Sequence, residues 1–515
     1  MSDASIALNR FGIGARPGET GIDARRWLLG QFDGFDARPA PIATLPSTES
    51  IARSLADYLV DLREAQREAR QNPSPQSQNQ RRPAGYTQPR MSDEAMMGDA
   101  AAMQGDTMAE MNDDAGPRDP VAQLRRFVRQ QGRDIYSGAV NARTLCSINS
   151  PAPFVERLVH FWANHFAVSI DKFIIVGLAG QLEFDAIRPH VLGSFRDMLF
   201  AVERHPAMLL YLDQAGSIGP NSPVGIRLAN RPRANGQRGG LNENLAREIL
   251  ELHTLGVRTG YTQNDVTEFA RAMTGWTVAG LTRGLAARWL GADGKAGDFV
   301  FAEPIHEPGT RTILGKSWPQ QGYSKAASVL EMLAVHPSTA RHIATKLARH
   351  FAGDDPPPAL VARLEKRFLE TSGDLPSLYR VLIEAPECWA PQPLKFKTPW
   401  EWSVSALRSL GSRELEKFAA VGLMRQLGQP VWQPGSPAGW DDVGPAWAGP
   451  DAIMRRVEAA ERIAARTRDQ VDARTRAAEI FPGTLSQSTA QAIARAESPG
   501  QGVALMLVSP EMMRR

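Results

Sequence analysis

Apolar side chains recur every three or four residues along most of this chain of 515 residues, the spacing that lines one face of an α-helix. The apolar positions of residues 51–62 form one such stripe, namely Ile51, Leu55, Tyr58, Leu59 and Leu62. The same periodicity predicts helices over residues 124–136, 153–168, 183–202, 243–255, 263–274, 323–334, 338–351, 358–372, 375–384, 399–410 and 453–477, followed by a final pair of helices. The pattern therefore predicts a mainly α fold with a multi-helix globular body.

Residues 276–314 depart from this pattern. Glycines at positions 280, 284, 291, 294 and 297 separate short pieces rich in β-favouring residues, such as 276–278 and 298–301. We therefore expect a small antiparallel β-hairpin inserted in the helical body near residues 276–314.

A change in composition divides the chain. Residues 71–120 are rich first in Gln, Asn, Pro and Ser and then in Met, Ala and Asp, with scarcely a branched aliphatic residue. Such a segment cannot bury enough apolar area to offset its ordering entropy. We expect a disordered low-complexity linker at 71–120, between an N-terminal helical segment (1–70) that packs on the main body and a main helical domain (121–515).

Overall composition is that of an ordinary soluble globular protein, with 43% hydrophobic and 22% charged residues. The net charge of +3 is too small for this length to indicate nucleic acid or an anionic membrane as a partner. Cys146 and Cys388 are the two cysteines, so we expect no disulfide framework. Without a signal-peptide pattern or a run of about 18 apolar residues, we expect a cytoplasmic protein with no membrane span, although export with a partner stays open.

The first candidate site is the predicted helix over residues 242–253. At about 100° per residue, Asn244, Arg247, Glu248 and Glu251 share one face, opposite an apolar face. Two carboxylates and an amide on one stripe can hold a cation or position a water. Ion pairs between residues four positions apart, together with helix capping, explain several of these side chains without any site. Both interpretations stay open.

The second candidate is the segment that contains His160, Asn164 and His165. The two histidines lie about 140° apart around a helix, so they cannot bind one metal from the same face without help. His165 falls on the apolar side of this helix. Either His165 is a core histidine with satisfied ring nitrogens, or one of the two histidines, His165 or His160, meets the carboxylates of the 242–253 helix.

The third candidate follows the predicted hairpin, where His306 and Glu307 form a usable acid/base or ligand pair beside Arg311. A loop rich in arginine, glycine and asparagine, residues 222–240, leads directly into the 242–253 helix. This loop is either a lid that closes over an anionic ligand or a solvated insertion.

Lys395, Lys397, Glu401 and the loop over residues 429–440 offer polar and indole groups that can wall a pocket. Trp432, Trp440 and Trp447 either stack on a sugar or anchor this loop, which is rich in proline and glycine, to the body. The glycine patterns of dinucleotide- and phosphate-binding loops are absent, as are the Gly-x-Ser-x-Gly, His-Glu-x-x-His and Cys-x-x-Cys motifs. These common chemistries therefore lose support.

Taken together, short motifs across nearly the whole chain resemble one bacterial family, domain of unknown function 1800. They lie at residues 8–12, 161–166, 195–197, 205–208, 242–248, 252–257, 274–276, 306–311, 428–430, 439–440 and 509–511. The family has no settled activity to carry over. Its genes often accompany those of a sulfatase-like family, domain of unknown function 1501, whose members look exported, so the resemblance implies a paired exported or envelope role.

The chain departs from the pattern of that family at two positions of the 306–311 motif. Glu307 stands where the family usually has Asp, and Arg311 stands where it usually has Lys. Both departures keep the charge and change the reach of the side chain. The basic insertion before Asn242 also looks longer than usual.

Two hypotheses about function follow. The first is an enzyme, with a metal-assisted hydrolase as one form and a divalent metal as an open option, that acts on an anionic or carbohydrate-like substrate. Its expected catalytic residues are His165, Glu248 and His306, and its expected substrate-binding residues are Asn164, Asn244, Arg247, Glu251 and Arg311. The second is a non-catalytic helical partner of the sulfatase-like protein, in which the same polar groups form buried structural networks.

Overall fold

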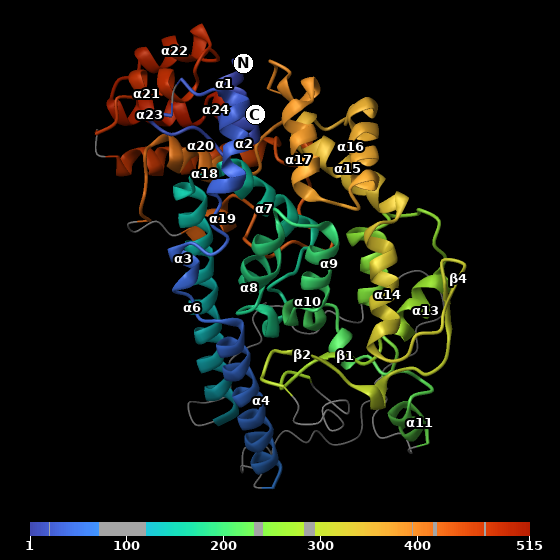
Figure 1. Cartoon of the computed structure of the whole chain (residues 1–515). Helices are drawn as coiled ribbons and strands as arrows, with labels where there is room; N and C mark the ends of the chain where they lie inside the picture. The colour runs from blue at the N-terminus through green and yellow to red at the C-terminus, as the bar shows by residue number, and fades with distance from the viewer. Residues whose placement is uncertain are drawn as a thin grey trace, which may run out of the picture.

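The computed structural model describes residues 1–19, 21–71, 120–230, 240–282, 294–393, 395–415, 420–467 and 470–515. The predicted linker at 71–120, apart from its two end residues, lies outside these ranges, and so does the 231–239 part of the predicted lid. Within the described residues the protein is mainly α-helical, as the periodicity predicts (Figure 1).

The helices follow one another as short and medium-length segments. Those before residue 274 are α1 (Asp3–Ile6), α2 (Ala24–Gly34), α3 (Ala40–Ala43), α4 (Thr48–Gln71), α6 (Pro120–Asn149), α7 (Pro153–His165), α8 (Ala179–Gln181), α9 (Phe195–Glu203), α10 (Pro206–Tyr211), α11 (Pro223–Ala229), α12 (Asn244–Glu248) and α13 (Gln263–Met273). Those after it are α14 (Tyr323–Ala334), α15 (Pro337–Ala352), α16 (Pro358–Glu370), α17 (Leu375–Glu384), α18 (Pro399–Ser409), α19 (Ala420–Gln426), α20 (Pro450–Arg466), α21 (Ala473–Ile480), α22 (Gln487–Ala494), α23 (Pro499–Leu507) and α24 (Pro510–Met513).

The β structure consists of two small antiparallel pairs among the described residues. Strand β1 (Trp276–Val278) pairs with β2 (Phe299–Phe301), and β3 (Arg311–Ile313) pairs with β4 (Lys316–Trp318). The predicted small antiparallel β structure near residues 276–314 is therefore confirmed. A second, separate strand pair follows it and ends at residue 318.

Two predicted helices are interrupted in the structure. The 183–202 segment forms a π-helical turn (Leu182–Ile187) and a 3-10 turn (Arg188–His190) before α9 begins. Pro189, which lies in the 3-10 turn, has no backbone N–H to continue a helix, and the Ser194 side chain caps α9 afresh. The 453–477 segment is likewise divided, because α20 ends at Arg466 and α21 starts again after Asp472, which caps it.

The two ends of the chain lie side by side (Figure 1). The Ser2 hydroxyl donates a hydrogen bond to the carbonyl of Pro482 at 2.5 Å. Phe11 is fully buried and stacks on Phe351 at 5.5 Å between ring centroids, with Phe154 edge-on at 5.6 Å. The first residues of the chain are therefore part of the same core as the central and later helices.

Helices α4 and α6 pack along each other and extend away from the body (Figure 1). The C-terminal end of α6 enters the body and packs against α18 and α19. Every helix in the described ranges is too short or too polar to cross a lipid bilayer.

Candidate functional site

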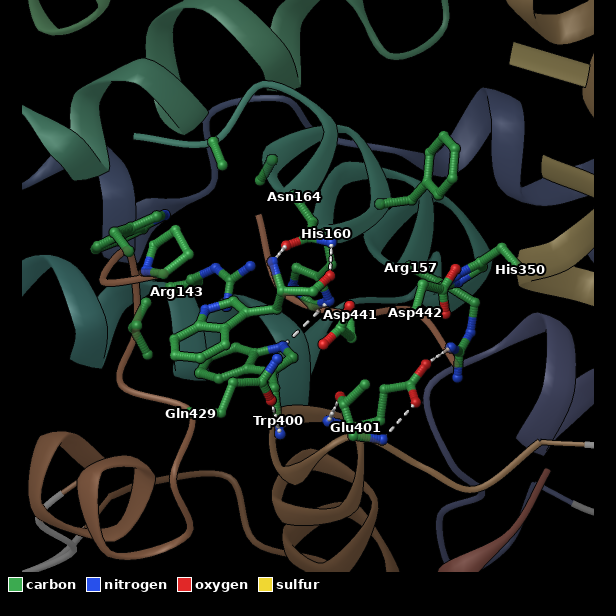
Figure 2. A pocket seen from close by; sticks show the side chains of 18 of the residues that line it. Arg143, Arg157, His160, Asn164, His350, Trp400, Glu401, Gln429, Asp441 and Asp442 are labelled. Atoms are coloured by element: carbon green, nitrogen blue, oxygen red, sulfur yellow. Dashed lines mark hydrogen bonds and ion pairs between the residues drawn. The ribbon is translucent and has the colours of Figure 1, made fainter. Parts of the chain in front are cut away.

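A cavity of about 110 Å³ lies where α6, α7, α15 and the start of α18 meet the loop over residues 429–442 (Figure 2). We call it the tryptophan pocket. Its lining comprises Ile13, Arg143, Arg157, His160, Phe161, Ala163, Asn164, Ala167, Val168, Lys346, His350, Thr398, Trp400, Glu401, Gln429, Val431, Trp432, Pro434, Trp440, Asp441 and Asp442. Because these residues come from remote segments of the chain, the pocket exists only in the folded protein.

One wall of the pocket is a cation held against aromatic rings. The Nε of Arg143 donates to both carboxylate oxygens of Glu183, at 2.9 and 2.8 Å, and the indole N–H of Trp432 donates to the same carboxylate at 3.0 Å. The guanidinium carbon lies 4.1 Å from the ring centroid of Trp400. The terminal nitrogens of Arg143 have no hydrogen bond to any described residue. Arg143 is therefore oriented from behind, while its terminal nitrogens stay free for a ligand.

His160 supports this wall and keeps a single tautomer. The indole N–H of Trp400 donates to His160 Nδ1 at 3.2 Å, so the ring proton lies on Nε2, which is 3.1 Å from the Ser147 hydroxyl oxygen. That hydroxyl donates to the carbonyl of Arg143 at 2.8 Å. Burial, together with Arg143 and other nearby cations, lowers the pKa of His160 well below its usual value. His160 therefore fixes Trp400 in place and leaves no ring nitrogen free to accept a proton.

The amide of Asn164 clamps the loop that closes the pocket. Its Nδ2 donates to the carbonyl of Trp440 at 2.8 Å, and its Oδ1 accepts the backbone N–H of Trp440 at 2.7 Å (Figure 2). Gly439 has a positive φ of 81°, and a Cβ built there would lie 2.3 Å from the backbone oxygen of Asn164. Only glycine fits this approach, so the loop position depends on the Gly439–Asn164 contact.

We expect Gly439→Ala to lower the free energy of unfolding by about 2–4 kcal/mol, because it adds a backbone clash to the strain of a positive φ. Gly315→Ala is the matched control, since Gly315 has a φ of 70° but no atom within 4 Å of a built Cβ. The control should lose only about 1 kcal/mol. Urea denaturation of both variants measures the difference, and equal losses would show that the contact with Asn164 is unimportant.

The opposite end of the pocket carries acidic groups. Asp442 Oδ2 lies 2.9 Å from His350 Nδ1, and its Oδ1 lies 2.8 Å from the amine of Lys395. Burial alone would raise the pKa of Asp442, but His350, Lys395 and Arg515 outweigh it and hold the pKa far below the usual range. The neighbouring Asp441 is exposed, and its carboxylate has no hydrogen bond or ion pair to a described residue. Asp442 is therefore committed to the structure, whereas Asp441 is free to accept hydrogen bonds.

Lys346 on α15 also lines the pocket, and His165 lies behind it. The Lys346 amine donates to His165 Nδ1 at 2.9 Å, and His165 Nε2 donates to the carbonyl of His253 at 3.1 Å. His165 is 1% exposed, so it does not itself reach the pocket. Burial lowers the pKa of Lys346 to about 8. The predicted catalytic histidine thus contacts a pocket residue that the sequence analysis missed.

The predicted residues of the 242–253 helix lie elsewhere. Asn244 is exposed, and Arg247 forms ion pairs with Glu243 at 3.1 Å and with Glu251 at 3.5 Å. Burial is the main cause that raises the pKa of Glu248. These residues are absent from the pocket lining, so their expected roles stay predictions.

His306 and Arg311 belong to a third, separate region. His306 Nδ1 donates to the carbonyl of Thr274 at 2.7 Å, and its Nε2 lies 3.2 Å from the amine of Lys325. Arg311 pairs with Glu268 at 3.3 Å. These contacts tie the segment after the first strand pair to its neighbours. The lining of the tryptophan pocket contains Asn164 among the eight predicted residues, and His165 lies directly behind Lys346. The other six are absent from this lining, and their roles stay predictions.

The pocket residues that the sequence did not predict include two cations, Arg143 and Lys346, and the acids Asp441 and Asp442. The sequence signals that point to this region are Glu401 and the tryptophan-rich loop over residues 429–440, whose polar and indole groups are expected to wall a pocket and of which the structure places several in the lining. In the described ranges, no group of three or more His, Cys, Asp and Glu side chains is arranged to hold a metal ion. The option of a divalent metal therefore gains no ligand set from these residues.

The fold and the site define a mainly helical protein with a small pocket walled by tryptophans and polar side chains. The chain belongs to the family described as protein of unknown function (DUF1800), whose profile matches residues 6–514. No curated protein and no solved structure matches the chain.

Proposed function

We propose that the protein is an enzyme whose tryptophan pocket binds a small anionic, carbohydrate-like substrate. The observation that carries this proposal is the state of Arg143, which is oriented by Glu183 and Trp400 while its terminal nitrogens have no partner among the described residues. A planar guanidinium with free nitrogens matches the geometry of a carboxylate, sulfate or phosphate group.

The rest of the lining suits a sugar. Trp440 offers an aromatic face, on which the C–H face of a sugar ring stacks. Gln429 uses its side-chain oxygen to accept the backbone N–H of Trp400 at 2.8 Å, which leaves its amide donors for a ligand. The carboxylate of Asp441 accepts hydrogen bonds from hydroxyl groups.

Two groups of the lining favour catalysis over simple binding. Asp441 and Lys346 are ionisable side chains without an ion pair to another described residue, and both line the pocket. The amine of Lys346, whose pKa is lowered by burial, is suited to proton transfer near neutral pH. Hydrolysis of the bound substrate is part of this proposal.

The test compares sugars that differ only in an anionic group. We expect glucuronate, glucose 6-phosphate or glucose 6-sulfate to bind more tightly than glucose in isothermal titration calorimetry. Arg143→Lys keeps the charge but loses the planar fork, so it should weaken binding of the anionic sugar by about tenfold or more.

Arg363→Lys is the control for this titration, because Arg363 is half exposed on α16 and pairs there with Glu387. It should leave the affinity unchanged. Equal affinity for glucose and all three anionic sugars, or full affinity in Arg143→Lys, would contradict the proposal.

The second hypothesis, a non-catalytic partner of a sulfatase-like protein, stays a prediction. Copurification of the chain with a sulfatase-like protein of the domain of unknown function 1501 family tests it. A stable complex that forms equally well with Arg143→Lys would support partner binding away from the pocket.

A further inference from the structure

Lys346 is the candidate reactive residue of the tryptophan pocket, because its amine contacts a histidine ring nitrogen instead of a carboxylate. Its side chain is half-buried in the pocket wall, and its amine donates to a ring nitrogen of His165 at 2.9 Å. No carboxylate of a described residue lies within ion-pair distance of this amine. Lysines that are taken out of water without a counter-charge are the ones that lose their proton at neutral pH.

The geometry of His165 fixes which atom donates. His165 Nε2 faces the carbonyl of His253 at 3.1 Å, and a carbonyl only accepts, so Nε2 carries the proton. Nδ1 therefore presents a lone pair, to which Lys346 donates one N–H. This bond holds the amine in place without requiring a positive charge on it.

Titratable and charged groups from three elements face the amine. His342 and Arg349 lie on the same helix, His165 comes from α7, and Asp442 comes from the closing loop. Burial is the largest influence and lowers the pKa of Lys346 to about 8, while Asp442 acts in the opposite direction and Arg349 lowers it further. About one molecule in ten then carries a neutral amine at pH 7, compared with fewer than about one in a thousand for an ordinary lysine.

We propose that Lys346 forms a Schiff base with the carbonyl carbon of an anionic aldehyde or ketone bound in the tryptophan pocket, and that His165 is its positioning residue. The lone pair of the neutral amine forms the C–N bond, and the carbonyl oxygen takes up the proton that the nitrogen releases. The resulting hydroxyl group then leaves as water together with the second N–H proton of the amine, and the C=N bond forms, so the step needs no oxidant or metal. The inference rests on the proposed function, because Arg143 holds the anionic group of the substrate.

The test traps the imine on the full-length protein. Glyoxylate, a small anionic aldehyde, is added with cyanoborohydride, and peptide mass spectrometry measures modification of each lysine over time. The exposed Lys366, whose side chain is 78% accessible, is the internal reference. We expect Lys346 to react about tenfold faster than Lys366 at pH 7, with a rate that rises with pH around a midpoint near 8. Equal rates at the two lysines would overturn the proposal.

Two variants separate positioning from reactivity. Lys346→Met should abolish the fast site and leave the reference unchanged. His165→Phe should slow the reaction of Lys346 and move the midpoint of its pH profile, an effect that a purely structural histidine would not produce. If His165→Phe does not fold, the comparison of Lys346 with Lys366 in the wild type still decides.

Acetaldehyde, which lacks the anionic group, distinguishes this proposal from the proposed function. Equally fast reaction of Lys346 with acetaldehyde and glyoxylate would support the reactive amine and contradict anion binding by Arg143. Binding of anionic sugars that depends on Arg143, together with no selective modification of Lys346, would overturn the Schiff base and leave the proposed function standing.

Discussion

Replacement of Glu401 by glutamine is expected to lower the free energy of unfolding by about 3–5 kcal/mol, because it leaves two buried cations without a counter-charge. Glu401 forms an ion pair with Arg157 and lies 3.0 Å from the guanidinium of Arg515, and both arginine side chains are 1% exposed. Burial alone would raise the pKa of Glu401, but Arg515 and Arg157 outweigh it and hold this pKa well below the usual range.

Urea denaturation near pH 7 measures this loss. Glu370→Gln is the matched control, since Glu370 is half exposed and its pairs with Lys366 and Arg367 are 3.8 Å long. The control should change stability by less than about 0.5 kcal/mol. Because the folded pKa of Glu401 is depressed, its contribution is present above the unfolded pKa of about 4.3 and is lost as the pH falls below that value. A loss in Glu401→Gln no larger than that of the control would contradict the expectation.

Replacement of Lys397 by methionine is expected to raise the free energy of unfolding by about 2–4 kcal/mol near pH 7. Lys397 has no exposed surface, and its amine has no hydrogen-bond partner among the described residues. Burial is the main reason that its pKa falls to about 7, with Glu401 acting in the opposite direction and nearby arginines adding to the decrease. Methionine has a similar length and needs no partner.

The pH dependence of stability gives this prediction a second readout. The amine of Lys397 has a pKa of about 7 in the folded protein and about 10.4 in the unfolded chain. Between these values the unfolded state binds more protons, so this group makes the wild type more stable as the pH rises from about 7 to about 10. The slope should be smaller in Lys397→Met, whereas Lys366→Met on the surface should keep it. A destabilised Lys397→Met with an unchanged slope would contradict the argument.

The Glu401 cluster also forms part of the pocket wall, because Glu401 and Arg157 both line the pocket. Arg157 Nη2 donates to the carbonyl of Gly12 at 2.7 Å, and Arg515 Nη1 donates to the carbonyl of His350 at 2.7 Å. Through Glu401, these bonds join the first and last segments of the chain at the pocket wall. Loss of the Glu401 cluster would therefore also change the shape of the pocket. Each pocket variant should be checked for correct folding before its binding is measured.

Several elements could be predicted closely because their signals are local. Helices α14 and α17 span the residues that the apolar periodicity predicts, 323–334 and 375–384, and α17 has Asp374 as its N-cap. The prediction of one continuous helix over residues 183–202 is wrong. The apolar spacing continues through Pro189, but Pro189 has no backbone N–H with which to continue the helical hydrogen bonds.

The candidate site could be predicted only in fragments. Asn164 was expected to bind substrate, yet its amide is used by the backbone of Trp440. Of the two interpretations of His165, the structure agrees with the core histidine, since it is buried behind Lys346 and both ring nitrogens have partners. In each case the sequence correctly predicts a polar residue on a helix. It does not predict the partner of that residue, because the partner comes from a distant segment of the chain.

The amino-acid sequence by itself determined the helical class of this protein and most of its helices, because periodicity, caps and prolines act within one or two turns. Only the tertiary structure decided which polar groups share a pocket. Arg143, Lys346, Trp400 and Asp442 come from four separate segments, and their meeting depends on how the helices pack around the core. Packing also decided which charges are neutralised and which amine stays free, since burial and neighbouring charges exist only once the chain is folded.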